Sequence, residues 1–389
     1  MVTLTSIVVL LRVEGVDLAR LPEKLRLVLE RVVRKLSRRE TVSGVGLFGS
    51  WSRGDADTNS DVDLLVVDGR DFEYEYVDRL ECEDFLVDLN YIPKKWVIGS
   101  VPPEIDQKLY EMVVLHDREW LLTNTKDWIS RTYRKPQRVG IRTEVYLVES
   151  DIYLSRAASA YSRGDFQSAC VFAGMGLESI LKILVEVNLL PISNTRFVGF
   201  LERSAKKLGC PKFFSTYLAV SRLYRLSRRD AERRIGLFRV AWDDVWSFVK
   251  DNASVLDSLH FKVRSKLEYY GKPGFLRGMI ARSQEIIHAG MYAEASHYLL
   301  RVLVDLLENY AWLASTVEGI KLNYTTLFRS LKGLKETPME VYETAVEAFN
   351  VRDVTQREAE EVLKLARETA LSVRRQRRDL IRRFVGPLG

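Results

Sequence analysis

The chain has 389 residues, more than the roughly 100–200 residues of one domain, so two or three folded units are expected. Hydrophobic residues make up 47% and charged residues 29%, which excludes an intrinsically disordered chain. The net charge of +6 permits a polyanionic partner without requiring one. Three cysteines, Cys82, Cys170 and Cys210, lie far apart and match no metal or redox spacing, so we expect a reducing cytoplasm.

The first 150 residues alternate short β-rich runs with helical patterns, which predicts a small α/β sheet domain. A helix is expected over Leu21–Leu36, where apolar residues recur with helical spacing. Five runs are strand candidates: Ile7–Val13, Val42–Phe48, Asp61–Val67, Phe85–Ile92 and Glu111–Leu115. The apolar start, Ile7–Leu11, is too short for a secretory signal, and no window approaches the roughly 18 uninterrupted apolar residues of a membrane span. We therefore expect a cytoplasmic protein without membrane contact.

Beyond residue 150 the pattern is almost entirely helical, with few strand signals and only occasional Gly or Pro. The chain is therefore expected to be α+β, with a mixed sheet flanked by helices followed by a largely all-α region. We divide it into a sheet domain at residues 1–145, a helical domain at 146–275, and a second helical unit at 276–389 that ends in a basic helix.

The helical half contains a weak internal repeat, whose copies are Tyr161–Ala169 and Ile287–Ala295. The copies share a glycine, an aromatic residue and an alanine: Gly164 and Gly290, Phe166 and Tyr292, Ala169 and Ala295. In both, one helix is expected to end at the glycine and the next to begin at the aromatic residue. A duplicated helical hairpin is the simplest interpretation, although this pattern also recurs by chance in unrelated hairpins.

The tail from Thr355 to Phe384 is a predicted helix whose last part, Arg374–Arg383, is crowded with arginine. Cations near a helix C-terminus interact favourably with the helix dipole, so a solvated basic helix end accounts for them. The alternative is a contact with a nucleic-acid phosphate backbone, whose binding would depend strongly on salt.

A strand candidate runs into a glycine turn at residues 49–54. Gly49 lets the backbone approach an anion where a side chain would obstruct it, and Ser50 adds a hydroxyl donor. If a helix or turn begins here, its free N–H groups point at the same anion, and Arg53 adds a charge-assisted contact. The segment therefore predicts a cradle for phosphate groups.

Two aspartates follow this turn, separated by one residue. Asp61 and Asp63 lie in a run that suits a buried strand, whose alternation places both carboxylates on one face. Asp88, in the next apolar run, is the candidate third carboxylate or a general base. Hard oxygen ligands of this kind suit Mg²⁺, two ions of which could act on a triphosphate, with Mn²⁺ as an alternative. Three other carboxylates look like part of an exposed connection: Glu81, Glu83 and Asp84.

The order of these motifs, Gly-Ser, a spacer and Asp-x-Asp, resembles the signature of the DNA polymerase β-like nucleotidyltransferase superfamily. It is similar above all to the minimal nucleotidyltransferases and the aminoglycoside nucleotidyltransferase type. The resemblance covers roughly residues 40–125 and includes Val113–Trp120, which is similar to the strand and turn that often follow the third carboxylate. It implies that residues 1–145 transfer a nucleoside monophosphate from a nucleoside triphosphate to an acceptor hydroxyl. It also implies triphosphate binding by Gly49 and Ser50, and metal binding by Asp61, Asp63 and Asp88.

The helical half is similar, less specifically, to the HEPN domains often coupled to minimal nucleotidyltransferases. Ala157–Ala169 and Gly176–Lys182 look like their first helical hairpin. Many HEPN domains are ribonucleases with an Arg, a short spacer and a His near the start of a late helix, and Arg282 and His288 have roughly that spacing. These two residues precede the second repeat copy, which corresponds to a first helix, so the nuclease interpretation is disfavoured. All histidines are expected to be structural: His116, His260, His288 and His297.

In such enzymes the acceptor is chosen by whatever packs against the catalytic sheet, so a protein, an RNA end and a small molecule all stay open. The alternatives to a transferase with an ordinary acceptor are an antitoxin-type AMP transferase or neutraliser of a HEPN toxin partner, a ribonuclease, and a non-catalytic RNA-binding or scaffold protein. A homodimer is also left open.

Overall fold

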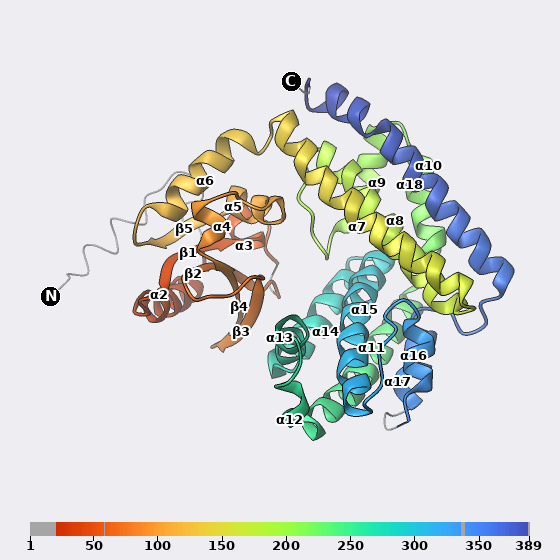
Figure 1. Cartoon of the computed structure of the whole chain (residues 1–389). Helices are drawn as coiled ribbons and strands as arrows, with labels where there is room; N and C mark the ends of the chain where they lie inside the picture. Colours follow the sequence, from red (N-terminus) through yellow and green to blue (C-terminus); the bar gives the residue numbers. More distant parts are fainter. Residues whose placement is uncertain (1–20, 58, 336–338, 388–389) are drawn as a thin grey trace. The chain divides into compact units, whose positions relative to one another are not determined.

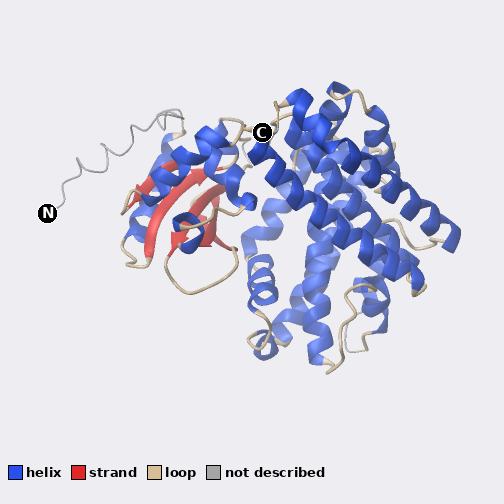
Figure 2. Ribbon diagram, turned by 45° about the horizontal axis from the view of Figure 1, so that its top comes forward, coloured by secondary structure: helices blue, strands red, loops and turns tan. Residues whose placement is uncertain are grey.

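The computed structural model describes residues 21–57, 59–335 and 339–387, and its chain divides into two units (Figure 1). The first unit is Met1–Tyr133 with Lys272–Gly278, and the second is Arg134–Gly271 with Met279–Gly389. Within the described residues, all strands belong to the first unit (Figure 2). The α+β fold class is therefore confirmed. The strand candidate Ile7–Val13 lies outside the described residues.

The first unit contains one mixed sheet with the strand order β3-β4-β2-β1-β5. Its strands are β1 Val42–Phe48, β2 Val62–Asp68, β3 Tyr76–Cys82, β4 Phe85–Pro93 and β5 Val113–Asp117. β2 and β4 are parallel, whereas the other neighbours are antiparallel. Four of the predicted strands are confirmed, but the last begins later than predicted because Glu111 ends a helix. β3 was not predicted, because its alternating charged residues look like a loop.

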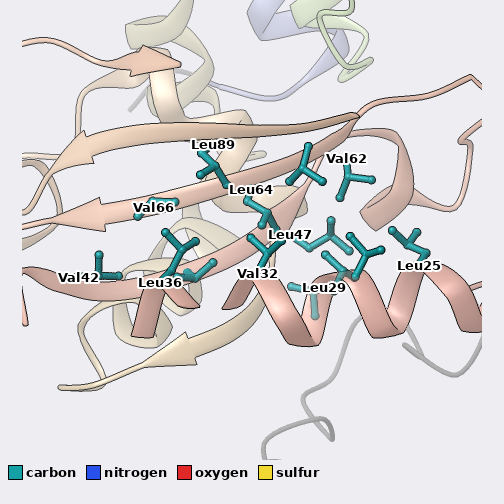
Figure 3. Close-up of a cluster of buried hydrophobic side chains, with 14 of the residues drawn as sticks. Leu25, Leu29, Val32, Leu36, Val42, Leu47, Val62, Leu64, Val66 and Leu89 are labelled. Carbon is teal, nitrogen blue, oxygen red and sulfur yellow. The ribbon is translucent and has the colours of Figure 1, made fainter. Parts of the chain in front are cut away.

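Helix α2 (Glu23–Ser37) covers one face of this sheet. Its buried side chains follow the helical repeat and pack against the inner residues of β1, β2 and β4 (Figure 3). The opposite face is covered by a second apolar cluster that includes residues of α5 (Asp106–Glu111) and α6 (Leu121–Thr132). Three short helices complete the unit: α3 Ser50–Arg53, α4 Lys95–Ile98 and η2 Pro103–Ile105. Because both faces are covered, β1 and β2 are buried almost throughout.

The second unit is helical. Its elements are α7 Pro136–Ser162, α8 Phe166–Val187, α9 Phe197–Lys207, α10 Pro211–Val220, α11 Arg228–Asp251, α12 Ala253–Leu256, α13 Phe261–Tyr270, α14 Pro273–His288, α15 Tyr292–Val317, α16 Leu327–Gly333, α17 Met339–Ala348 and α18 Gln356–Phe384. Residues 273–278 of α14 belong to the first unit. The domain limits expected after residues 145 and 275 both fall inside continuous helices, α7 and α14. Helix α8 is long and apolar enough to cross a membrane, but 94% of its apolar window is buried, as in the core helix of a helical domain.

The expected duplicated hairpin is present and extends to five helices, α7–α11 and α14–α18. Gly164 and Gly290 stand in the first turn of each copy with φ of 75° and 76°. The turns that follow α10 and α17 likewise place Arg222 and Asn350 at φ of 56° and 54°. The fifth helix of each copy begins after a hydroxyl residue whose side chain accepts from a first-turn N–H: Ser227 and Thr355.

The two copies also exchange helix caps. Glu294, the third residue of α15, accepts hydrogen bonds from the N–H groups of Val198 (3.0 Å) and Gly199 (2.9 Å) at the start of α9. Ser168, the third residue of α8, accepts one through Oγ from the N–H of Phe328 (2.9 Å) at the start of α16. The third residue of the second helix in each copy therefore accepts hydrogen bonds from helix N–H groups of the other copy that have no partner within their own helix.

The fifth helices are exchanged as well. α18 packs against α7, α8 and α10 of the first copy, and α11 packs against α15 and α17 of the second. Each copy completes its apolar core with a helix of the other. This interlocking explains why the helical residues form one unit instead of two.

Candidate active site

Four strands carry the predicted carboxylates and their neighbours in one row across the sheet. Asp63 of β2 lies opposite Asp88 of β4, and Phe48 of β1 lies opposite Asp63. On the far side, Arg79 of β3 lies opposite Asp88. Because Gly49 directly follows Phe48, the register brings the glycine turn, two aspartates and an arginine together.

The glycine turn lies directly against one of these aspartates. Gly49 has φ 78° and ψ −153°, a conformation that residues with a side chain rarely adopt. A Cβ atom added to it would lie 2.5 Å from Oδ2 of Asp63, so there is no room for one. Ser50 then begins α3, with its side chain half-buried. The structure therefore brings Gly49 directly against the second aspartate of the Asp-x-Asp pair, Asp63.

Arg53, predicted to contact phosphate groups, pairs with two carboxylates of the same chain. Its Nη1 donates to Oε2 of Glu111 (2.7 Å), and its Nε is 3.2 Å from Oδ1 of Asp55. Glu111 Oε1 also accepts the N–H of Gly49 (3.1 Å), which was expected to face an anionic ligand. The Glu111 side chain is only 7% exposed, and burial raises the pKa of its carboxyl, although Arg53 opposes this. Arg53 and Glu111 thus hold the turn in place.

Glu111 is a site residue that the sequence did not reveal, because it is 62 positions from Gly49 and was expected to lie in a strand. Two further bonds stabilise the same turn. Ser52 Oγ donates to the carbonyl of Gly49 (2.9 Å), and Trp51 Nε1 donates to the carbonyl of Ser60 (3.2 Å). The loop between β1 and β2 is therefore fixed at both ends.

The carboxylate pair at Asp61 and Asp88 is bridged by an arginine. Arg79 Nε donates to Asp88 Oδ1 (2.6 Å), and Nη2 donates to Asp88 Oδ2 (2.7 Å) and Asp61 Oδ2 (2.9 Å). The exposed fractions of the three side chains are 4% for Arg79, 8% for Asp88 and 12% for Asp61. Asp61 stands just before β2 and not within it. Asp61 and Asp88 are therefore brought together as predicted, but around a guanidinium group.

The donor set of Asp61, Asp63 and Asp88 has the chemistry of a hard divalent cation site, because all three ligands would be carboxylates. Elsewhere in the chain the described residues offer no rival, since no group of three or more His, Cys, Asp or Glu side chains there could hold a metal ion. The three predicted ligands do not form such a group either. They fit a metal by ligand type, but Arg79 binds two of them, Asp61 and Asp88.

A short segment distant in sequence, Lys272–Gly278, belongs to the same unit. Arg79 Nη1 donates to the carbonyl of Gly274 (3.5 Å), and Arg277 Nη2 donates to Oε2 of Glu81 (2.7 Å). Glu81, expected in an exposed connection, lies in β3. The other two alternatives to Asp88 lie in the exposed turn after β3: Glu83 and Asp84.

Two of the four histidines make structural hydrogen bonds, His297 and His260. His297 is buried, its Nδ1 lies 2.8 Å from the hydroxyl of Tyr217, and burial lowers its pKa to about 4. His260 accepts the N–H of Lys262 (3.2 Å) at the start of α13. His288 ends α14, the first helix of the second copy, which agrees with the argument against a nuclease motif there.

The mixed sheet places a glycine turn against one carboxylate, with a second carboxylate in register on the neighbouring strand. Residues 29–121 match the family model of the nucleotidyltransferase domain, and this match spans the whole row of site residues. Residues 29–121 are therefore similar to a nucleotidyltransferase domain, which supports a general nucleotidyl transfer activity.

Among solved structures, the chain is similar to a nucleotidyltransferase-like protein from Exiguobacterium sibiricum. The sequence identity is 12%, the TM-score is 0.32, and the match covers 72% of this chain and 80% of the other. These values are too low to carry a function or a domain arrangement over. No curated protein matches the chain.

Proposed function

We propose that the first unit transfers a nucleoside monophosphate from a nucleoside triphosphate to an acceptor hydroxyl and releases pyrophosphate. The observation that carries this proposal is the register of Asp63 and Asp88 beside the Gly49 turn. The acceptor oxygen forms a bond to the α-phosphorus while the bond from that phosphorus to the leaving pyrophosphate oxygen breaks. The hydroxyl proton passes to a base, for which Asp88 is our candidate.

We further propose that the activity depends on Mg²⁺, with two ions bound and Mn²⁺ as an alternative. Asp61, Asp63 and Asp88 would hold the metal, which supplies charge neutralisation for the phosphate groups. Gly49 leaves space for the triphosphate, and Ser50 offers it a hydroxyl donor. We assign Arg53 to fixing the turn and not to phosphate contact, because Glu111 and Asp55 already bind its guanidinium.

Incubation of the full-length protein with labelled nucleoside triphosphates, Mg²⁺ or Mn²⁺, and candidate proteins, RNA ends and small molecules tests the proposal. Asp63→Asn should reduce transfer by about 100-fold or more, because a charge that acts on the phosphates is lost. Asp84→Asn, which changes an exposed aspartate in the turn after β3, is the matched control and should retain activity. No transfer and no triphosphate binding by the unaltered protein would refute the proposal.

A second candidate function, contact with nucleic acid, is favoured by a basic surface in the helical unit. The start of α7 and the end of α18 lie side by side, since a Cβ atom on Gly386 would lie 3.1 Å from Cγ of Pro136. Exposed cations from both segments gather there: Lys135, Arg375, Arg378 and Arg383. Such a group suits a phosphate backbone, which would make the acceptor or partner an RNA.

Arg378→Ala should weaken RNA binding and reduce the salt dependence by about one unit of slope. Arg357→Ala, which changes an exposed arginine at the opposite end of α18, is the control. If both variants bind RNA like the unaltered protein, the arginines are only a solvated helix end.

The other expectations stay proposals. A HEPN-like character of the helical unit keeps open an antitoxin-type AMP transferase or neutraliser of a HEPN toxin, and a non-catalytic RNA-binding scaffold. Retention of cellular function by Asp61→Asn would favour the scaffold. The cytoplasmic location and the homodimer likewise remain open to fractionation and to measurement of the molar mass in solution.

A further inference from the structure

Arg79 is placed where the proposed function requires a metal ion. It lies on β3 directly opposite Asp88, and its guanidinium binds both oxygens of that carboxylate and one oxygen of Asp61. Two parallel N–H···O bonds to one carboxylate are the strongest form of this contact, because the planar fork matches the carboxylate. Arg79 therefore makes a specific ion pair and not a loose surface contact.

Burial makes this pairing necessary. The Arg79, Asp61 and Asp88 side chains are at most 12% exposed, and carboxylates in such surroundings are strongly disfavoured without a positive partner. One guanidinium group satisfies this requirement for two carboxylates. A divalent cation at the same carboxylates would satisfy it equally well, but it would be repelled by a guanidinium group that stays bound there.

We infer that Arg79 is a resident counter-ion of the active site, and that a divalent cation reaches Asp61 and Asp88 only by displacing it. This inference rests on the proposed function, because it concerns the carboxylates assigned there to metal binding. In the protein without metal, Arg79 therefore occupies the position at Asp61 and Asp88 that the cation would take. Metal binding becomes an exchange of one cation for another, and its affinity includes the work of releasing Arg79.

Metal binding without any nucleotide tests this inference. Mn²⁺ is titrated into the full-length protein and the free ion is followed by electron paramagnetic resonance. Arg79→Met removes the competing charge but keeps the length of the side chain, so it should bind Mn²⁺ on the order of 10- to 100-fold more tightly than the unaltered protein. The melting temperature of Arg79→Met should also rise more on Mn²⁺ addition, because metal then neutralises carboxylates that have lost their partner.

Arg79→Lys covers the case in which Arg79→Met does not fold. Lysine keeps the charge but cannot bind both oxygens of Asp88 in parallel, so Mn²⁺ affinity should lie between those of the other two proteins. Equal Mn²⁺ affinity of the unaltered protein and of every variant that folds would overturn the inference. The control Arg277→Met removes another arginine that pairs with β3, at Glu81, and should leave Mn²⁺ affinity unchanged.

The outcomes for the two proposals can be told apart. Tighter Mn²⁺ binding by Arg79→Met without nucleotide transfer to any acceptor would support the counter-ion and reject the transferase. Transfer by the unaltered protein with unchanged Mn²⁺ affinity in the variants would support the transferase and reject the counter-ion.

Discussion

Replacement of Gly49 by alanine is the most direct test of how the turn and the aspartates depend on one another. The structure predicts two separate penalties. The backbone at φ 78° and ψ −153° is disfavoured for alanine by about 1–3 kcal/mol. The new methyl group would also lie 2.5 Å from Oδ2 of Asp63, and such overpacking costs a further 1–3 kcal/mol or so.

Gly54 in the same loop provides a matched control. It also has a positive φ, 76°, but with ψ of 22° it lies in the left-handed helical region, and a Cβ atom there would meet nothing within 4 Å. Gly54→Ala should therefore cost only about 1–2 kcal/mol. Because both variants are Gly-to-Ala changes, the effect on the unfolded chain cancels in the comparison. Gly49→Ala should be the less stable by about 1–4 kcal/mol.

Hydrogen exchange of peptides that cover β1 and β2 measures this difference, because it reports opening of the first unit separately from the helical unit. Triphosphate binding by both variants is measured in parallel, and only Gly49→Ala should lose it. Equal stability of the two variants within about 0.5 kcal/mol would show that Asp63 does not constrain the turn. Retained triphosphate binding by Gly49→Ala would show that the turn does not need its close approach to Asp63.

Three further predictions concern the helical unit. Glu294→Ala and Ser168→Ala should each lower the melting temperature and each cost about 1 kcal/mol, since each removes a cap that one copy provides to the other; an effect at only one position would contradict the reciprocal arrangement. The lowered pKa of His297 means that the unfolded chain takes up a proton more readily, so the free energy of unfolding should fall by up to about 3 kcal/mol as the pH drops from 6.5 to 4. His297→Gln should remove this contribution in urea titrations at several pH values, and an unchanged pH profile would refute it. Arg377→Ala should cost about 3 kcal/mol and expose the amides of α7 to exchange, because Arg377 is 9% exposed and binds that helix through three hydrogen bonds; full protection of α7 would argue against the exchange of fifth helices.

The sequence was sufficient for the parts of the site that depend on local pattern. Val42–Phe48 and Phe85–Ile92 are apolar runs of strand length, and the structure places strands there. The Gly49 turn and the aspartates at positions 61 and 63 could be predicted from the order of the motifs along the chain, which does not require knowledge of the strand register. The register that pairs Asp63 with Asp88 required the structure, because parallel strands are joined by a long connection whose length does not fix their alignment.

The helical unit shows the same division. Gly-x-aromatic-x-x-Ala marks the end of one helix and the start of the next, so the duplicated hairpin could be predicted from local residues. The exchange of α11 and α18 between the copies could not, because each is an amphipathic helix whose apolar face does not specify the partner. The predicted domain limit at residue 275 assumed that helices close in sequence pack together, whereas α11 and α18 each pack with the other copy.

Arg79 and Glu111 were not predicted for a related reason, although a residue of opposite charge was to be expected beside each buried charged group. The largely buried carboxylates of Asp61 and Asp88 demand a cation, and the partly buried guanidinium of Arg53 is stabilised by an anion. Each partner is distant in the chain or lies on a strand that was not predicted, so only the fold identifies it. Both groups of the proposed site are thus bound by opposite charges of the same chain. A metal ion at Asp61 and Asp88 would then replace a partner that is already bound, and its affinity would reflect the difference between two sets of contacts and not the contacts of the bound state alone.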